Sequence, residues 1–224
     1  MEDTKEKTQE ITQPAPPAQD AETALAAKPN TEVGTVWTDM SEYTRVGRIA
    51  QMMAKTTLVP ESYQGRPENC FLAINFAMRL GMEPLTVMQN LYVVKGKPSW
   101  SGQFCMALIR ANPAFSNVRL VYTGQKGTDN RGAYVTAIRL SDGSVVDGTE
   151  VTIAMAKAEG WTSNPKWRNM PEQMLGYRAA AFFARLHCPE AMLGIQTAEE
   201  VEDVDTTKAS TRARHLTDAL RSDA

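Results

Sequence analysis

The most informative stretch of the chain, residues 161–185, reads WTSNPKWRNMPEQMLGYRAAAFFAR. Proline is favoured in the first turn of a helix, and the apolar residues after Pro171 recur at helical spacing, so a helix is predicted from Pro171 to about His187. On a helical wheel, one arc gathers a stripe expected to face the core, made of Leu175, Ala179, Phe182, Phe183 and Leu186.

Two arginines lie on another side of this predicted helix. Arg178 and Arg185 are about 20° apart on the wheel and roughly 10.5 Å apart along the axis, on a strip shared with Met174 and Ala181. Such a strip is either an ordinary solvated face or a surface that binds anions, and the wheel alone does not distinguish the two.

A third side of the same helix carries only small residues. Gly176, Ala180 and Ala184 keep this side narrow. A neighbouring element, or another subunit, is therefore expected to approach it closely.

Proline and glycine divide the rest of the chain into further helices and strands. The predicted helices run from Ser41 to Met53, Pro67 to Leu80 with Gly81 as the cap, Pro84 to Leu91, Gln103 to Ala111, and Val151 to Glu159 with Gly160 as the cap. The predicted strands are a hairpin at Leu91–Val94 and Ser99–Ser101 with a basic turn, followed by Asn117–Tyr122, Ala133–Leu140 and Val145–Asp147. This order predicts an α+β fold in which a small antiparallel meander is flanked by helices.

Composition separates a folded body from two acidic ends. Residues 1–38 hold three lysines against seven acids and have no hydrophobic period, which predicts a disordered acidic leader. Residues 194–224 hold four cations against seven acids, whereas residues 39–193 carry a net charge of +5. We expect one folded domain over residues 39–204 and a flexible tail over 205–224. A basic body with acidic ends suits a polyanion-binding protein, although a soluble surface uses the same residues.

Several classes of protein are disfavoured. No apolar run is long enough for a membrane span and no signal peptide is recognisable, so a cytoplasmic protein is expected. Three separate cysteines and two histidines have no metal-ligand spacing. Adjacent helical residues such as His187 and Cys188 point about 100° apart and cannot act together as a catalytic pair. No phosphate-binding GxxxxGK[ST] loop is present, which argues against an ATP-driven protein.

The order of residues in the 161–185 stretch resembles a known family. Its pattern of Trp167, Pro171, Met174, Leu175, Arg178, Ala179 and Arg185 is similar to a helix of the RecT/Red-beta family of phage single-strand DNA annealing proteins. Phe71–Pro84, Tyr92–Gly102 and the acidic Thr197–Asp203 resemble further blocks of that family, so the resemblance covers about residues 45–204.

The resemblance implies an activity and partners. A member of that family binds single-stranded DNA, pairs complementary strands into an annealed duplex intermediate without nucleotide hydrolysis, and assembles into homo-oligomeric rings or helical filaments. It also implies a phage 5′–3′ exonuclease and a host single-strand DNA-binding protein as partners. No catalytic residue, protein-bound metal or cofactor is expected, and magnesium dependence of the DNA complex is left open.

The resemblance assigns DNA-backbone contacts to Arg178 and Arg185. This chain departs from the family at Glu172 and Gln173, where relatives commonly carry basic residues, and at Gly176, which replaces another frequent cation. Nearby cations at positions 166 and 168 are expected to compensate.

Annealing needs little more than cations, because two strands repel until their phosphates are neutralised. The candidate phosphate-binding residues are Lys95, Lys97, Lys166, Arg168, Arg178 and Arg185. The candidate base-stacking residues are Tyr92, Trp100 and Trp161, of which Trp100 is favoured because it is near the basic turn, although each suits a core position equally well.

Two other functions remain open. An accessory DNA-processing nuclease would need clustered carboxylates that hold divalent ions, and no acidic pair shares a face of a predicted element. A phage interaction protein would act through the tail after Asp205, and deleting residues 205–224 would separate this role from annealing.

Overall fold

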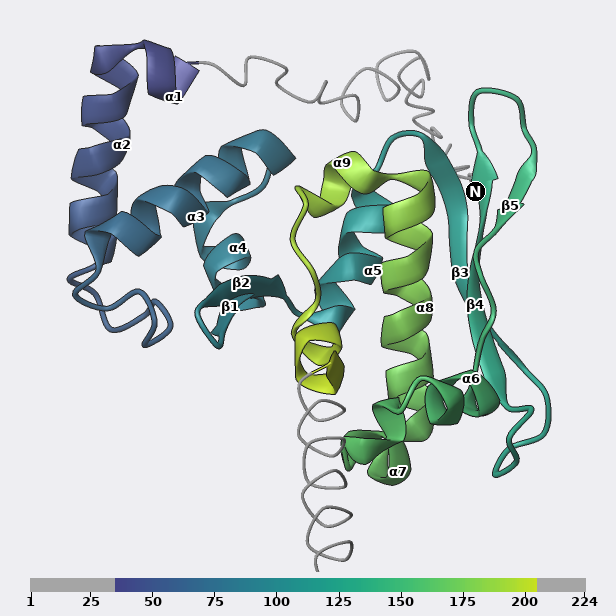
Figure 1. The fold of residues 1–224 in the computed structure, drawn as a ribbon. Coiled ribbons are helices and arrows are strands. Elements are labelled where there is room, and N and C mark those ends of the chain that lie inside the picture. The colour runs from purple at the N-terminus through teal and green to yellow at the C-terminus, as the bar shows by residue number, and fades with distance from the viewer. Residues whose placement is uncertain (1–34, 205–224) are drawn as a thin grey trace, which may run out of the picture.

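The computed structural model describes residues 35–204, and Figure 1 shows two groups of elements in this range. One group is helical and carries a short hairpin, and the other places two helices against a sheet. In chain order the elements are α1 (Thr35–Thr38), α2 (Met40–Met53), α3 (Pro67–Leu80), α4 (Pro84–Asn90), β1 (Leu91–Val94), β2 (Lys97–Trp100), α5 (Gly102–Ala111), β3 (Phe115–Thr123), β4 (Gly132–Arg139), β5 (Val145–Asp147), β6 (Val151–Thr152), α6 (Ile153–Ala158), η1 (Trp161–Ser163), α7 (Lys166–Asn169), α8 (Pro171–His187) and α9 (Pro189–Met192). Residues 198–204 are also helical.

The larger sheet is built around β4. Strand β3 pairs with it along one edge, from Phe115 opposite Arg139 to Thr123 opposite Gly132. Strands β5 and β6 pair with different parts of its other edge, and all these pairings are antiparallel. The predicted α+β class with small antiparallel sheets flanked by helices is confirmed.

Helix α8 lies between the sheet and α5 (Figure 1). Leu175, Ala179 and Phe183 are fully buried as predicted, and the ring of Phe183 meets that of Phe115 on β3 at 5.5 Å. Leu186 was assigned to the same stripe but is 66% exposed. A wheel gives a direction from the helix axis and does not show how far along the axis the neighbouring elements extend.

The narrow side of α8 has the close neighbour that its small residues predict. A Cβ atom added to Gly176 would lie 2.9 Å from a methyl carbon of Leu120 on β3. Helix α5 makes an equally close approach, because a Cβ atom on Gly102 would lie 2.5 Å from Cγ of Tyr177. These glycines let α8 approach β3 and α5 at van der Waals distance.

In the helical group, α2 begins close to the predicted Ser41 and α3 ends at the predicted Gly81. Asp39 caps α2 by accepting a hydrogen bond from the Ser41 amide at 2.7 Å, so the helix begins one residue before Ser41. Gly81 ends α3 with a positive φ of 64°, as predicted.

Some elements differ from the sequence prediction. The predicted helix at 151–159 begins at Ile153, because Val151 and Thr152 pair with β4 as β6 and Thr152 caps the helix. Helix α1 falls within the predicted leader, and its Val36 is buried. The short elements η1, α7 and α9 and the helical residues 198–204 were not predicted. The rest of the leader and the tail lie outside the described residues.

Within residues 35–204, no helix combines the length and apolar character needed to cross a membrane.

Two glycine-to-alanine substitutions should have opposite effects on stability. We expect Gly102→Ala to lower the free energy of unfolding by about 1–3 kcal/mol, because the new methyl group would overlap the Tyr177 side chain. Gly47→Ala, in the interior of α2 with nothing within 4 Å of the added Cβ, should raise it by about 0.5–1 kcal/mol. Urea unfolding of both variants measures this. Equal effects would contradict the close α5–α8 contact.

Candidate nucleic-acid interface

The acidic segment 197–203 folds back onto α8. Thr197 and Glu200 form a capping box: Thr197 Oγ1 accepts from the Glu200 amide at 3.3 Å, and a Glu200 carboxylate oxygen accepts from the Thr197 amide at 3.1 Å. The preceding Gln196 carbonyl accepts from the Trp100 amide at 2.9 Å. This cap fixes where the helical turn of residues 198–204 begins and therefore which acidic side chains face α8.

Arg178 lies at the centre of the contact. Its guanidinium donates a hydrogen bond to the carboxylate of Asp203, lies 3.8 Å from a Glu200 oxygen, and stacks over the Trp161 ring at 4.0 Å from the ring centroid. Its residue is only 6% exposed. Helix α8, η1 and the acidic segment are thereby joined by one side chain.

Asp203 has no exposed surface and accepts from two further side chains. Nδ2 of Asn164 and Nε1 of Trp167 each donate to it at 2.9 Å. Burial raises the pKa of Asp203 and lowers the pKa of Arg178, whereas the hydrogen bonds to the carboxylate favour its charged form. The Arg178–Asp203 pair is therefore stabilised by the hydrogen bonds that Asn164 and Trp167 donate to Asp203 as well as by the attraction between its two charges.

The helical wheel left open whether Arg178 and Arg185 form an exposed strip that binds anions. The structure exposes only one of these two arginines. Arg178 is buried, and the acidic segment covers it. Arg185 keeps 45% of its side chain exposed while its guanidinium donates to Glu200. Lys166 is similar, with 46% of its side chain exposed and its ammonium 2.7 Å from Glu202. In this structure Arg178 has a structural role, and phosphate contacts at Arg185 and Lys166 stay predictions.

The predicted stacking residues fall into two groups. Trp100 is completely buried, with Nε1 donating to the Met192 carbonyl at 3.0 Å, so it cannot stack on a base here. Trp161 is buried at 8% exposure beneath Arg178. Tyr92 is 44% exposed on β1. The structure gives no support to the preference for Trp100, because Phe76 on α3 and Phe104 on α5 lie against its ring and no part of it is exposed.

The basic turn of the hairpin is present as predicted. Lys95 and Gly96 take positive φ angles of 51° and 78°, which suits a two-residue hairpin turn. Lys95 and Lys97 are exposed, and Lys97 is the first residue of β2. With Tyr92 on the neighbouring strand, the hairpin presents two cations and one aromatic ring to solvent.

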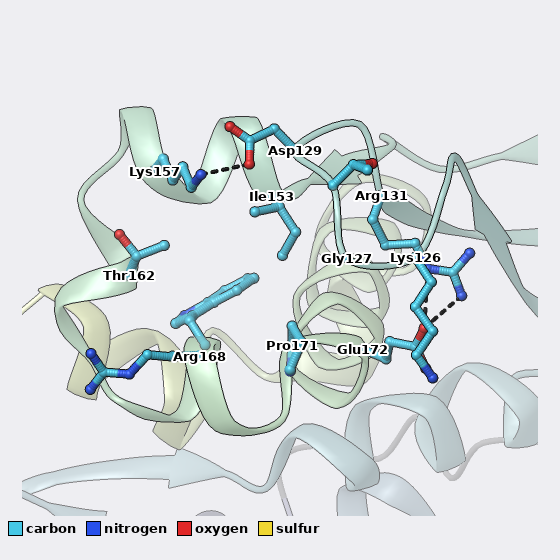
Figure 2. A pocket seen from close by; sticks show the side chains of 12 residues that line it. Lys126, Gly127, Asp129, Arg131, Ile153, Lys157, Thr162, Arg168, Pro171 and Glu172 are labelled. Carbon is cyan, nitrogen blue, oxygen red and sulfur yellow. Dashed lines mark hydrogen bonds and ion pairs between the residues drawn. The ribbon is translucent and has the colours of Figure 1, made fainter.

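Arg168 lies beside a cleft that the sequence did not predict. Figure 2 shows this cleft between the loop before β4, helix α6, and the segment from η1 to the start of α8. Its lining residues are Lys126, Gly127, Thr128, Asp129, Arg131, Ile153, Lys157, Thr162, Trp167, Arg168, Pro171 and Glu172.

Four cations and two acids surround the cleft. Lys157 pairs with Asp129 at 2.6 Å, and Arg131 pairs with Glu172 at 2.8 Å. Lys126 lies 3.5 Å from Glu172 but keeps 80% of its side chain exposed. Of the four cations only Arg168 was predicted as a site residue. The other three are 5 to 31 residues apart in sequence, and only the pairing of β3 with β4 and of β6 with β4 brings them together.

The structure also gives the surroundings of Cys188 and of the residue types that could bind a metal ion. Burial raises the pKa of Cys188 to about 12, the opposite of what a thiol nucleophile requires. Among residues 35–204, no group of three or more histidine, cysteine, aspartate or glutamate residues is arranged to hold a metal ion.

Comparison with known proteins identifies a family. The model of the RecT family matches residues 44–212, which is three quarters of the chain. No curated protein and no solved structure matches significantly.

Removing Arg178 should cost far more stability than removing Arg185. We expect Arg178→Ala to lower the free energy of unfolding by about 3–5 kcal/mol, because it leaves the buried Asp203 carboxylate without its cation. Arg185→Ala should lower it by about 1–2 kcal/mol, since Arg185 is half exposed and the buried Glu200 carboxylate keeps Arg178 and the Thr197 amide as partners. Chemical denaturation measures both, and a smaller loss for Arg178→Ala than for Arg185→Ala would contradict the assigned roles.

The charged Glu200 carboxylate should stabilise the folded protein at neutral pH and lose this effect in acid. Burial alone would raise its pKa, but the hydrogen bond and charge of Arg185, the hydrogen bond from the Thr197 amide and the charge of Arg178 together lower the pKa below the ordinary value of 4.5. A lowered pKa stabilises the folded state above pH 4.5, and this contribution is lost as the pH falls through the folded-state value. The difference in unfolding free energy between wild type and Glu200→Gln should therefore be constant from neutral pH to about pH 5 and shrink below pH 4.5.

Thermal or urea unfolding across this pH range tests the expectation. Glu159→Gln, at an exposed position at the end of α6, is the matched control. A difference between wild type and Glu200→Gln that grows in acid would exclude the assigned ion pair.

Proposed function

Because the chain belongs to the RecT family of phage single-strand annealing and recombination proteins, we propose that it binds single-stranded DNA and anneals complementary strands without hydrolysing a nucleotide. The family match carries this proposal. It covers α8, the hairpin, the cleft and the acidic segment together, so every candidate contact lies within the matched residues 44–212.

The distribution of exposed cations supports the proposal. The hairpin presents Lys95 and Lys97, and the cleft presents Lys126 and Arg168, all on exposed positions. Cations that neutralise phosphates release counterions and reduce the repulsion between two strands, while the bases supply the pairing energy. Contacts to the backbone carry no sequence information, which suits a protein that anneals any complementary pair.

Assembly and partners complete the proposal. We infer that the chain acts as a homo-oligomer, a ring or helical filament, in the cytoplasm of the bacterial host, where neighbouring protomers would hold a strand continuously. A phage 5′–3′ exonuclease would generate its single strands and a host single-strand DNA-binding protein would share them. The tail proposed to contact such partners begins after Asp205 and lies outside the described residues.

Annealing of two complementary oligonucleotides, followed by fluorescence quenching without nucleotide, tests the function. We expect wild-type protein to accelerate annealing, because phosphate neutralisation reduces the barrier to encounter. Absence of acceleration at every salt and magnesium concentration would exclude the annealing function.

Alanine substitutions identify the cations involved. The double variant Lys97→Ala/Arg168→Ala should weaken single-strand binding and reduce the slope of log Kobs against log salt by about 0.7 for each phosphate that the protein no longer neutralises. Arg48→Ala, an exposed cation on α2 outside the hairpin and the cleft, is the matched control and should leave the slope unchanged. An unchanged slope in the double variant would remove these two residues from the interface.

A further inference from the structure

The β1–β2 hairpin has one edge that no other element covers. The outer edge of β2 is occupied, because the Trp100 amide donates to the Gln196 carbonyl at 2.9 Å. On β1, Val93 lies opposite Pro98, which has no amide hydrogen, so the amide and carbonyl of Val93 point away from β2. Within residues 35–204 no backbone hydrogen bond to another element is found at Val93. An open strand edge of this kind can accept an added strand.

The hairpin with this open edge carries positive charge and no acidic group. Residues 91–100 contain Lys95 and Lys97 but no aspartate or glutamate. Both lysines are exposed, and so are Tyr92 and Val93 on β1. By charge complementarity, the segment best suited to this edge is extended and acidic.

The leader of this chain contains an acidic stretch with the period of a strand. Residues 2–10 read EDTKEKTQE. Side chains alternate between the two faces of an extended chain, so Glu2, Glu6 and Glu10 would share one face with the two threonines, opposite the two lysines. The stretch has no proline, whereas residues 11–34 contain four, and proline is poorly tolerated in a paired strand. Residues 2–10 are therefore the part of the leader best suited to the open edge.

The leader is long enough to bring this stretch to the hairpin. Residues 11–34 connect it to Thr35, where α1 begins. Fully extended, such a connection spans about 80 Å at roughly 3.3–3.6 Å per residue. A domain of the size of residues 35–204 has a radius of gyration of only about 15 Å. A segment tethered in this way reaches an effective concentration in the millimolar range, so even weak contacts keep it bound part of the time.

We propose that residues 2–10 of the leader add to the open edge of β1 when no DNA is bound, with the glutamate face against Lys95 and Lys97. The inference rests on the proposed single-strand binding and adds a control over it.

The docked leader competes with phosphates for the cations of the hairpin. A polyanion binds there only if it displaces the leader. A long strand, whose phosphates are contacted at many points, displaces it more readily than a short or sparsely charged polyanion. The leader therefore suppresses weak, unproductive binding and yields to a strand long enough to be annealed.

Binding of a thymidine oligonucleotide by full-length charge variants tests the competition, with fluorescence anisotropy giving the Kd. The variant Glu2→Gln/Glu6→Gln/Glu10→Gln lacks the glutamate face. At low salt it should bind about 2- to 30-fold more tightly than wild type, the effect of losing two exposed ion pairs. The gain should shrink as salt is raised, because the ion pairs are screened. Equal Kd values for the two chains at low salt overturn the competition and leave the proposed function intact.

The matched control removes the same charge from another part of the leader. Asp20→Asn/Glu22→Gln/Glu32→Gln also changes the net charge of the leader from −4 to −1 but leaves residues 2–10 intact. It should bind as wild type does. An equal gain from both variants shows repulsion by overall charge and overturns the docked segment.

The hairpin is tested by combining variants. In a chain that carries Lys95→Ala/Lys97→Ala, removing the glutamate face should no longer change the Kd, because the partners of the glutamates are gone. A gain of unchanged size places the leader elsewhere and overturns its assignment to β1.

Carbodiimide crosslinking without DNA gives a result that does not depend on DNA binding. The reagent joins a carboxylate to an amine in contact with it, so the wild-type chain should yield a product between residues 2–10 and Lys95 or Lys97. Absence of this product overturns the docking whether or not the chain binds DNA. If the product forms but no chain binds single strands, the docking stands and the proposed function fails. In a mixture of isotope-labelled and unlabelled chains, products only between different chains overturn docking within one chain.

Discussion

The buried carboxylate of Asp203 holds together elements that are otherwise separate in the chain. It accepts from Asn164 before α7, from Trp167 on α7 and from Arg178 on α8. An uncompensated buried charge is strongly unfavourable, so these partners must all be in place at once. The position of η1 and α7 over α8, and hence one wall of the cleft, depends on this arrangement.

The acidic segment that carries Asp203 also determines which cations near α8 are already paired. Acidic side chains of residues 199–203 engage Arg178, Arg185 and Lys166, whereas Lys95 and Lys97 on the hairpin and Arg168 beside the cleft lie at exposed positions. A solvated cation can exchange water and counterions for phosphate, whereas a buried pair must first be separated. Of the two arginines on α8, Arg178 is therefore the less accessible to a phosphate.

The indole of Trp167 belongs to the structural network and also borders the cleft, with only 3% of the residue exposed. Its ring nitrogen belongs to the Asp203 network while its ring lines the cleft. The sequence identified this residue through a resemblance, but not its two roles.

Local signals determined most of the secondary structure. Pro171, Gly81 and the Lys95–Gly96 turn each set a backbone conformation through their own chemistry, and the α+β class followed from their order. The capping box at Thr197 and Glu200 was also readable, and would have predicted the last described helix. Only the tertiary structure decided which cations stay exposed. Burial of Arg178 and Trp100 depends on segments more than twenty residues away that fold over them, and helical spacing describes one helix without its neighbours.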